Sequence, residues 1–188
     1  MPMGSAATIH LEPIAPVHAP EVQRLASDAR VADTSNVPHP YPADGAATWI
    51  RYSMALRDQG REVNFAVIAD DLAALVGVCG VSSIEERPRR GELGYWIGVP
   101  HWGRGYASAA AADLVRRAFE EHALESLYSS CLVRNPASRR VLEKTGFRHV
   151  GYGTHPHPKW GPADRFALFE LTRLEWLNAR RRAMHLCD

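Results

Sequence analysis

Short segments rich in β-branched, aromatic and alternating apolar residues recur along the chain, and this pattern predicts strands. Two of these segments flank Asp70-Asp71 and indicate a β-hairpin around that pair. The seven segments expected to be strands are residues 8–14, 64–69, 75–81, 92–99, 127–133, 147–151 and 165–171.

Apolar residues three and four positions apart predict helices between and after these strands. The first is expected to open at Pro20 and to include Ala29, and a second is expected after Asp44 as its N-cap. A long amphipathic helix follows at residues 107–119, and a short one at 136–145. Thr172 and Glu175 have capping-box spacing, so a C-terminal helix is expected over residues 173–186.

The segment of residues 34–42 interrupts the helical pattern. It contains Pro38, Pro40 and Pro42, which favour extended backbone and exclude a helix. No repeat, low-complexity tract or linker divides the chain, and 188 residues suffice to bury one core. We therefore expect a single domain over residues 1–188, with its core at about 8–172.

Charge and cysteine content narrow the classes of partner and location. The formal net charge of +1 favours neither a nucleic acid nor an anionic membrane as partner. No apolar run has the length of a transmembrane helix, and the N-terminal MPMGSAATIH does not resemble a signal peptide. Cys79, Cys131 and Cys187 have no metal-binding spacing. We expect free thiols in a cytoplasmic protein and no metal site.

A glycine-rich turn joins the strand at Glu92 to the long helix. Gly103, Gly105 and Ala107 leave its backbone almost bare, so N–H groups can converge on one point at a helix N-terminus. Such a point suits a phosphate. The turn lacks the Gly-Lys-Ser/Thr of a Walker loop and has Ser108 where a dinucleotide fingerprint needs a third glycine. Neither signature is complete, so a nucleotide-binding domain ranks behind the functional hypotheses given below.

A second motif lies at residues 135–147. Asn135 is a suitable N-cap, Pro136 a suitable first helical residue and Gly146 a suitable C-terminal stop, so a capped helix explains the segment by itself. The same residues spell N-x-x-S-x-x-x-x-x-K-x-G-F, which places Ser138 three positions after Asn135. A binding role and a capping role for Asn135 are compatible, because an N-cap lies at the mouth of a helix.

The two motifs together resemble those of the GNAT superfamily of N-acetyltransferases. The turn matches the family's Gln/Arg-x-x-Gly-x-Gly/Ala pattern except at Trp102, and that spelling is similar to the Rim-type branch of ribosomal-protein N-terminal acetyltransferases. The resemblance implies an α/β fold with a central, mixed but mostly antiparallel sheet, flanked by helices and splayed at an acetyl-CoA site. It also implies the cosubstrate-binding residues, which are Ile97, Val99, Trp102, Gly103, Arg104, Gly105, Tyr106, Ala107, Asn135 and Ser138.

Acetyl transfer to an amine also needs proton transfer at two points. For the base, Glu92 is the first candidate, because period-2 alternation puts it on one strand face with Trp96. Its alternative role is an edge-strand ion pair with Arg89 or Arg90. For the acid, the resemblance points to Ser138, whose alternative role is to complete the first turn of its helix.

The loop of residues 153–164 and the proline-rich segment are expected to wall the acceptor site. Tyr41, Trp96 and Trp160 are the candidate substrate-binding residues, with packing as the alternative for Tyr41 and Trp160. His155 and His157 are further candidate bases, and as proline-flanked loop histidines they are not expected to bind a metal.

The resemblance implies transfer of an acetyl group from acetyl-CoA to a primary amine, with a protein N-terminal α-amine as the first hypothesis. The alternatives are a small-molecule amine, such as a polyamine or an aminoglycoside, and a non-catalytic acyl-CoA-binding module. The same resemblance makes a homodimer plausible without requiring one.

Overall fold

Seven strands form one sheet in the order β1-β2-β3-β4-β5-β7-β6. The structure is a computed structural model that describes residues 7–185. Every neighbouring pair is antiparallel except β4 and β5, which are parallel. The strands are β1 (Ile9–Pro13), β2 (Val63–Ala69), β3 (Ala74–Glu86), β4 (Arg89–Ile97), β5 (Ser126–Leu132), β6 (Arg148–Gly153) and β7 (Phe166–Thr172).

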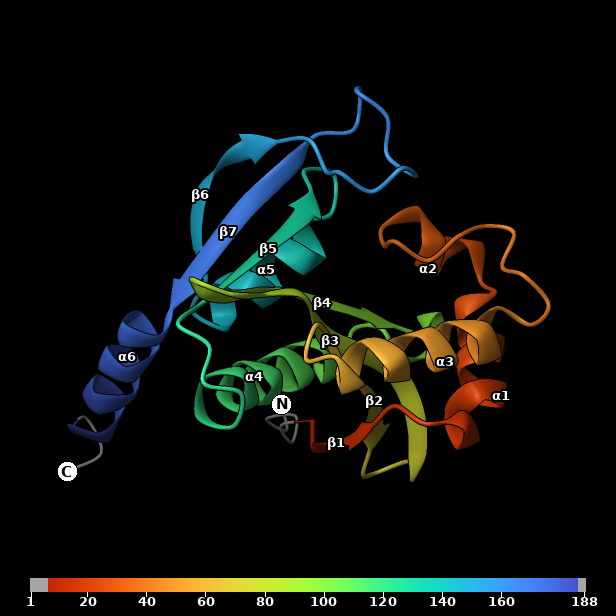
Figure 1. Cartoon of the computed structure of the whole chain (residues 1–188), viewed down its shortest axis with the longest axis horizontal. Helices are drawn as coiled ribbons and strands as arrows, with labels where there is room; N and C mark the ends of the chain where they lie inside the picture. The colour runs from red at the N-terminus through yellow and green to blue at the C-terminus, as the bar shows by residue number, and fades with distance from the viewer. Residues whose placement is uncertain (1–6, 186–188) are drawn as a thin grey trace, which may run out of the picture.

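Helices cover both faces of this sheet (Figure 1). On one face α4 packs across β1 to β4 and α5 packs against β5 and β6, while α1 and α3 lie on the other face. The α-helices are α1 (Ala19–Ala26), α2 (Ala29–Asp33), α3 (Gly45–Asp58), α4 (Tyr106–Glu120), α5 (Pro136–Lys144) and α6 (Arg173–His185), with short 3-10 helices at Pro16–His18 and Val99–His101.

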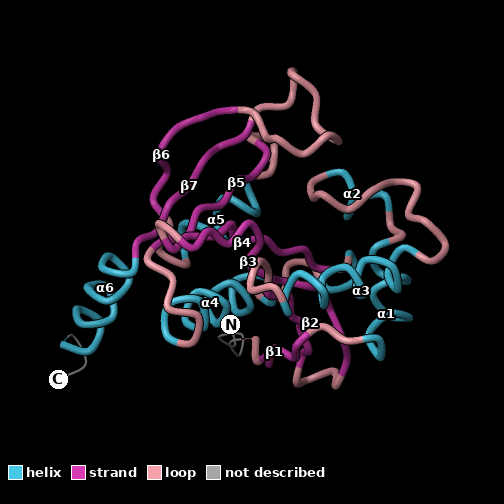
Figure 2. The backbone as a smooth tube through the Cα atoms, in the orientation of Figure 1, coloured by secondary structure: helices cyan, strands magenta, loops and turns pink. Residues whose placement is uncertain are grey.

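The sheet opens between β4 and β5. These strands pair only at Arg90, Gly91 and Glu92 of β4, and beyond Glu92 they diverge (Figure 2). The buried hydroxyl of Ser129 in β5 donates a 2.8 Å hydrogen bond to the Leu93 carbonyl at the start of the opening. The expected splay of a mixed, mostly antiparallel sheet is therefore present, and it exposes the end of β4 to a ligand.

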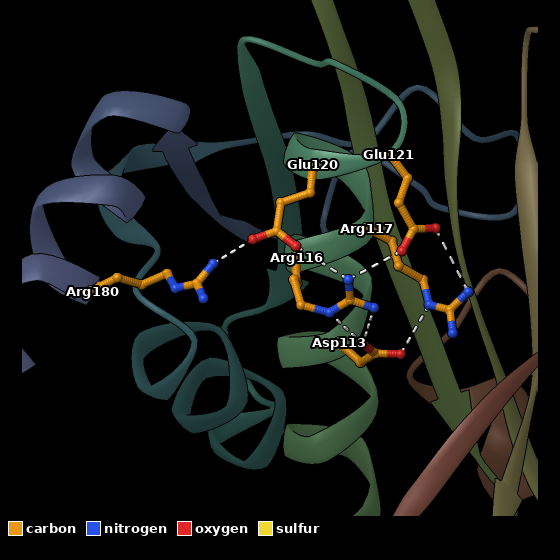
Figure 3. Close-up of polar contacts among 6 residues, drawn as sticks. All are labelled: Asp113, Arg116, Arg117, Glu120, Glu121 and Arg180. Carbon is orange, nitrogen blue, oxygen red and sulfur yellow. Dashed lines mark hydrogen bonds and ion pairs between the residues drawn. The ribbon is translucent and has the colours of Figure 1, made fainter. Parts of the chain in front are cut away.

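The long helix α4 carries the apolar face that its sequence predicts. Leu114, Ala118 and Phe119 are fully buried against the sheet. On the opposite face Arg116 lies between Asp113 and Glu120, at 2.8 and 3.2 Å (Figure 3). Glu120 also binds Arg180 of α6, and Trp176 of α6 packs on Phe119, with ring centroids 5.5 Å apart. These contacts attach the C-terminal helix to α4, and the predicted capping box of Thr172 and Glu175 opens it.

Some expected boundaries are wrong. The helix from Pro20 ends at Ala26, and Ala29 begins α2 instead, because Asp28 interrupts the helix and caps the Arg30 N–H at 3.0 Å. The strand expected to begin at Glu92 begins at Arg89 instead, and Arg89 and Arg90 pair with β3. Asp44 occupies the N-cap of α3, but its carboxylate accepts from the Thr48 hydroxyl rather than from a backbone N–H.

Candidate functional site

The glycine turn forms the N-terminus of α4. Gly103 and Gly105 both have positive φ, +75° and +86°, which L side chains adopt at a cost. Gly105 is the N-cap residue, and no side chain caps the helix there. The first turn of α4 therefore presents N–H groups that lack a helical partner, at the positive end of a 15-residue helix. This geometry fits a phosphate-bearing ligand.

Two aromatic side chains fix the turn in place. The Tyr106 side chain is 2% exposed, and its hydroxyl donates to the Asp71 carboxylate at 2.8 Å. The Trp102 indole N–H donates to the Ile97 carbonyl at 2.6 Å. Tyr106 can therefore reach a ligand only through its backbone, and the Ile97 carbonyl is already occupied.

A cavity of about 510 Å³ extends from the glycine turn to α5. Its walls include eight of the ten expected cosubstrate residues, whereas Val99 and Arg104 lie outside them. Its charged lining residues are Arg140 and Lys144 of α5, and no carboxylate of the described chain lines it. The eight are Ile97, Trp102, Gly103, Gly105, Tyr106, Ala107, Asn135 and Ser138. A cavity whose two charged lining residues are both cations, with open N–H groups at one end, suits an anionic ligand.

The second motif forms the capped helix that its sequence predicts. The Asn135 Oδ1 accepts the Ser138 N–H at 3.1 Å, so the capping role is present. The Ser138 hydroxyl lies 2.9 Å from the Tyr95 hydroxyl, which also reaches the Ser138 carbonyl at 3.2 Å. Burial raises the pKa of Tyr95, so its hydroxyl keeps its proton and remains a donor. Tyr95 therefore supports Ser138 from β4 across the open part of the sheet.

A second cavity, of about 690 Å³, lies on the other side of β4. Glu92, Gly94 and Trp96 of one strand face line it, and so do Leu93 and Tyr95 of the other face. Its charged lining residues are Glu92 and Asp44, and no lysine or arginine of the described chain lines it. The first cavity, lined by cations, is called the donor cavity below, and this one the acceptor cavity. The two meet at five shared residues, namely Thr34, Ser35, Tyr95, Trp96 and Ser138.

The carboxylate of Glu92 is held by His155. The His155 Nε2 lies 3.3 Å from the Glu92 Oε1, and the two side chains are 9% and 24% exposed. The alternative pairing of Glu92 does not hold, because Arg90 binds Glu85 at 3.0 Å and Arg89 donates to the His122 carbonyl. Glu92 is in a central strand rather than an edge strand.

The tautomer of His155 follows from its other nitrogen. Nδ1 accepts the backbone N–H of His157 at 3.0 Å, so in the neutral ring the proton lies on Nε2 and points at Glu92. The intervening Pro156 has no N–H and fixes its own φ, which places the next N–H over the imidazole. The same contact recurs between the Lys159 N–H and the His157 Nδ1 at 3.2 Å. In this arrangement the His155 Nε2–H donates to Glu92.

Lys159 joins the loop after β6 to the proline-rich segment. Its ammonium donates to three backbone carbonyls, those of Ser35 at 2.8 Å, Val37 at 2.6 Å and Ala32. Burial lowers the pKa of Lys159, but three acceptors around Nζ require protons there. The neighbouring Trp160 donates from its indole to the Asn36 side chain at 2.8 Å. These bonds hold together two walls of the acceptor cavity that lie 120 residues apart in sequence, and Figure 1 shows the two loops facing each other.

Tyr41 and Trp160, two aromatic candidates of the acceptor site, both pack on neighbouring residues and line the acceptor cavity. Tyr41 is half-buried, packs on the core between α1, α3 and the sheet, and lines the cavity. Trp160 packs edge-on against Phe166, with centroids 5.5 Å apart, and also lines the cavity. Gly94 opens the strand surface, since a Cβ there would meet nothing within 4 Å. Gly98 differs, because a Cβ there would lie 2.6 Å from the Leu25 side chain.

Sequence reasoning missed four contributors to the site, namely Tyr95, Arg140, Lys144 and Lys159. The first three lie within motifs already singled out, and a period of 3.6 from Asn135 would have placed Arg140 and Lys144 on one helix face. Among residues 7–185 no three His, Cys, Asp or Glu side chains are grouped as metal ligands, and no helix combines the length and hydropathy to cross a membrane. Cys79 and Cys131 are buried free thiols, while Cys187 lies outside the described residues.

A glycine turn at a helix N-terminus, a splayed sheet and a capped Asn-x-x-Ser helix in this order occur together in one known family. The family model described as "Acetyltransferase (GNAT) domain" matches residues 8–148. The chain belongs to the GNAT acetyltransferase family. Acetyl transfer is thus the chemistry of this domain, with acetyl-CoA as its cosubstrate, and the fit of the donor cavity to an anionic ligand agrees with that assignment.

Individual GNAT proteins resemble the chain at lower identity. The ribosomal-protein-serine acetyltransferase of Escherichia coli is 29% identical over 98 residues, 52% of this chain and 54% of that protein. Mycobacterium smegmatis RimJ in complex with CoA-disulfide has a TM-score of 0.81 at 21% identity, covering 90% of this chain and 84% of RimJ. Vibrio cholerae spermidine N-acetyltransferase, with CoA and spermine, has a TM-score of 0.77 at 17% identity, covering 90% and 98%.

These likenesses support the Rim-type branch that the motifs indicate. The first curated relatives are matched over 43%, 70% and 60% of their own length. The relatives act on different amines by name, so they leave the acceptor of this chain open.

Proposed function

We propose that the protein transfers the acetyl group of acetyl-CoA to a primary amine through residues of β4 and α5. The observation that carries this proposal is the meeting of two cavities of opposite charge at Tyr95, Trp96 and Ser138. One is lined by cations and open N–H groups, which suit an anionic donor. The other is lined by carboxylates, which suit a cationic acceptor. The single-domain organisation over residues 1–188 is part of the same proposal.

The donor cavity would hold the cosubstrate through the backbone of the glycine turn. The N–H groups of the first turn of α4 bind the diphosphate, and Arg140 and Lys144 lie along the same cavity. The Nδ2 group of Asn135 faces the passage between α4 and α5, since its Oδ1 is used by the cap. When bound, acetyl-CoA supplies an activated thioester carbonyl at the junction of the cavities.

Glu92 is the proposed base. Its carboxylate takes a proton from the ammonium of the acceptor, directly or through one water, and the amine nitrogen can then form the C–N bond. The Nε2–H of His155 orients that carboxylate in the wall of the acceptor cavity. Holding the amine and the donor together in one site supplies much of the rate, so loss of the base lowers activity without abolishing it.

Ser138 is the proposed acid. As the C–S bond breaks, its hydroxyl donates a hydrogen bond to the leaving sulfur, and the second proton lost by the amine nitrogen ends on that sulfur. The Tyr95 hydroxyl can donate to Ser138 in turn at 2.9 Å. The contribution is expected at the low end of the ~10²–10⁴-fold typical of general acid catalysis, because a serine hydroxyl is a weak acid.

A protein N-terminal α-amine is the first acceptor proposed, on the Rim-type resemblance. A small-molecule amine is the second, and the spermidine N-acetyltransferase among the structural neighbours supports it. A cytoplasmic location and a homodimer are further proposals that rest on cysteine content and on the family.

Thiol release from acetyl-CoA, followed with a panel of primary amines, tests the proposal. We expect release that depends on the amine and falls in Glu92→Gln and in Ser138→Ala. Glu85→Gln, which changes an exposed carboxylate on the neighbouring strand, is the matched control and keeps full activity. Tight CoA binding without release for any amine would instead establish a non-catalytic acyl-CoA-binding module. Tighter binding of ATP or NAD than of CoA would favour a nucleotide-binding domain.

A further inference from the structure

The walls of the acceptor cavity are aromatic to an unusual degree. Six tyrosine and tryptophan side chains that are not fully buried line it, from three separate segments of the chain. They are Tyr41, Trp49, Tyr52, Tyr95, Trp96 and Trp160. Among the described residues, two carboxylates also line the cavity, those of Glu92 and Asp44. The volume of about 690 Å³ is that of a pocket for a small organic molecule or a short terminal segment.

We propose that the acceptor carries one ammonium group on a short alkyl chain that ends in an aromatic ring. This inference rests on the proposed function and narrows its acceptor class. The ammonium would lie beside Glu92, and the ring would lie among the tyrosine and tryptophan side chains.

The face of β4 supplies the spacing for such a molecule. Glu92, Gly94 and Trp96 lie on one face at intervals of about 6.8 Å, since a strand rises about 3.4 Å per residue. The surface between the carboxylate and the indole is bare, because Gly94 has open space where a Cβ would be. An alkyl chain of two or three carbons crosses that bare surface and brings its ring against Trp96, where an offset or edge-on contact is favourable.

The charge of the cavity argues against a polyamine. Asp44 is exposed and its carboxylate accepts a hydrogen bond from Thr48, so Glu92 is the carboxylate beside the junction of the cavities. Each further ammonium would lose water against aromatic walls. Cation–π contacts with those walls recover only part of the lost hydration energy. A molecule with one ammonium and an apolar body avoids that loss.

The link between the two loops bounds the cavity on its outer side. Trp160 and Asn36 are hydrogen bonded across it, and Lys159 fastens the same two segments.

Two sources offer the required chemistry, a free arylalkylamine and a peptide whose N-terminal residue is aromatic. Both place one ammonium three bonds from a ring.

Steady-state thiol release distinguishes these cases. The acceptors compared are 2-phenylethylamine, hexylamine, spermidine and a tripeptide amide that begins with Phe. We expect kcat/KM for one of the two aromatic acceptors to exceed the values for hexylamine and spermidine by about tenfold or more. The better of the two aromatic acceptors identifies the source. Trp49→Leu, which alters only the acceptor cavity, should raise KM for the aromatic acceptor about tenfold and leave KM for acetyl-CoA unchanged.

Tyr152→Leu is the matched control, because Tyr152 is a half-exposed aromatic residue outside both cavities. Turnover of hexylamine or spermidine as efficient as that of the aromatic acceptors would overturn the inference and leave the proposed function intact. Should no amine release thiol, the proposed function fails. Calorimetric titration of 2-phenylethylamine into the CoA-saturated protein then still tests the pocket, and absence of binding would overturn the inference as well.

Discussion

Replacing His155 by leucine tests how Glu92 is oriented. The change removes the Nε2–H donor 3.3 Å from the Glu92 carboxylate and leaves an apolar side chain of similar bulk in a position that is 9% exposed. A hydrogen bond to a charged acceptor is worth about 1.5–3 kcal/mol. The separation exceeds the ~2.7–2.9 Å of the strongest such bonds, and Glu92 is 24% exposed, so the low end applies. We therefore expect roughly a tenfold loss of kcat.

The assay is thiol release at saturating acetyl-CoA with the best acceptor found. His155→Gln keeps a donor near the place of Nε2 and should restore most of the kcat that His155→Leu loses. KM for acetyl-CoA should not change, because His155 lines only the acceptor cavity. The Glu92→Gln background supplies a double-mutant cycle, in which His155→Leu should have little further effect. Losses that multiply in the double variant, or no recovery with glutamine, would refute a positioning role for His155.

Three further predictions concern the turn, the loops and the charge network. Gly105→Ala should cost about 1–2 kcal/mol of stability and weaken CoA binding in calorimetry, whereas Gly60→Ala, also at positive φ, should cost stability alone. Lys159→Met should raise KM for the amine but not for acetyl-CoA; an unchanged amine KM would contradict the role of the loops. Burial raises the pKa of Asp113, but the hydrogen bonds from Arg117 and Arg116 outweigh burial, so the pKa is lower in the folded chain than in the unfolded one. The Asp113 carboxylate therefore stabilises the fold above about pH 3.9, and this stabilisation is lost as pH falls through the folded pKa. Urea unfolding at pH 7 and pH 3 should show a smaller difference for Asp113→Asn than for the unmodified chain.

The parts of the site that the sequence predicts are those built from neighbouring residues. The turn at Gly103 and Gly105 and the helix capped by Asn135 depend on residues within a few positions of each other, so local chemistry determines them. The same holds for the face of β4 that carries Glu92 and Trp96, because a strand alternates by geometry alone.

The parts of the site that the sequence does not predict depend on contacts between segments far apart in the chain. The Tyr95 hydroxyl meets Ser138 where β4 and β5 diverge, and a contact across 43 residues is not visible in local patterns. Lys159 finds its three carbonyls more than 120 residues earlier in the chain. The helix predicted from Pro20 ends early for a local reason, because the Asp28 side chain caps the Arg30 N–H and starts a new helix there.

The position of Lys159 has a consequence for the chemistry next to it. A lysine side chain is itself a primary amine, and this one lies at the edge of a centre that modifies such groups. Nucleophilic attack needs an unshared electron pair on nitrogen, and Nζ has none while it donates to three carbonyls at once. Lys159, which holds together two walls of the acceptor cavity, is thus protected from acetylation by its own enzyme.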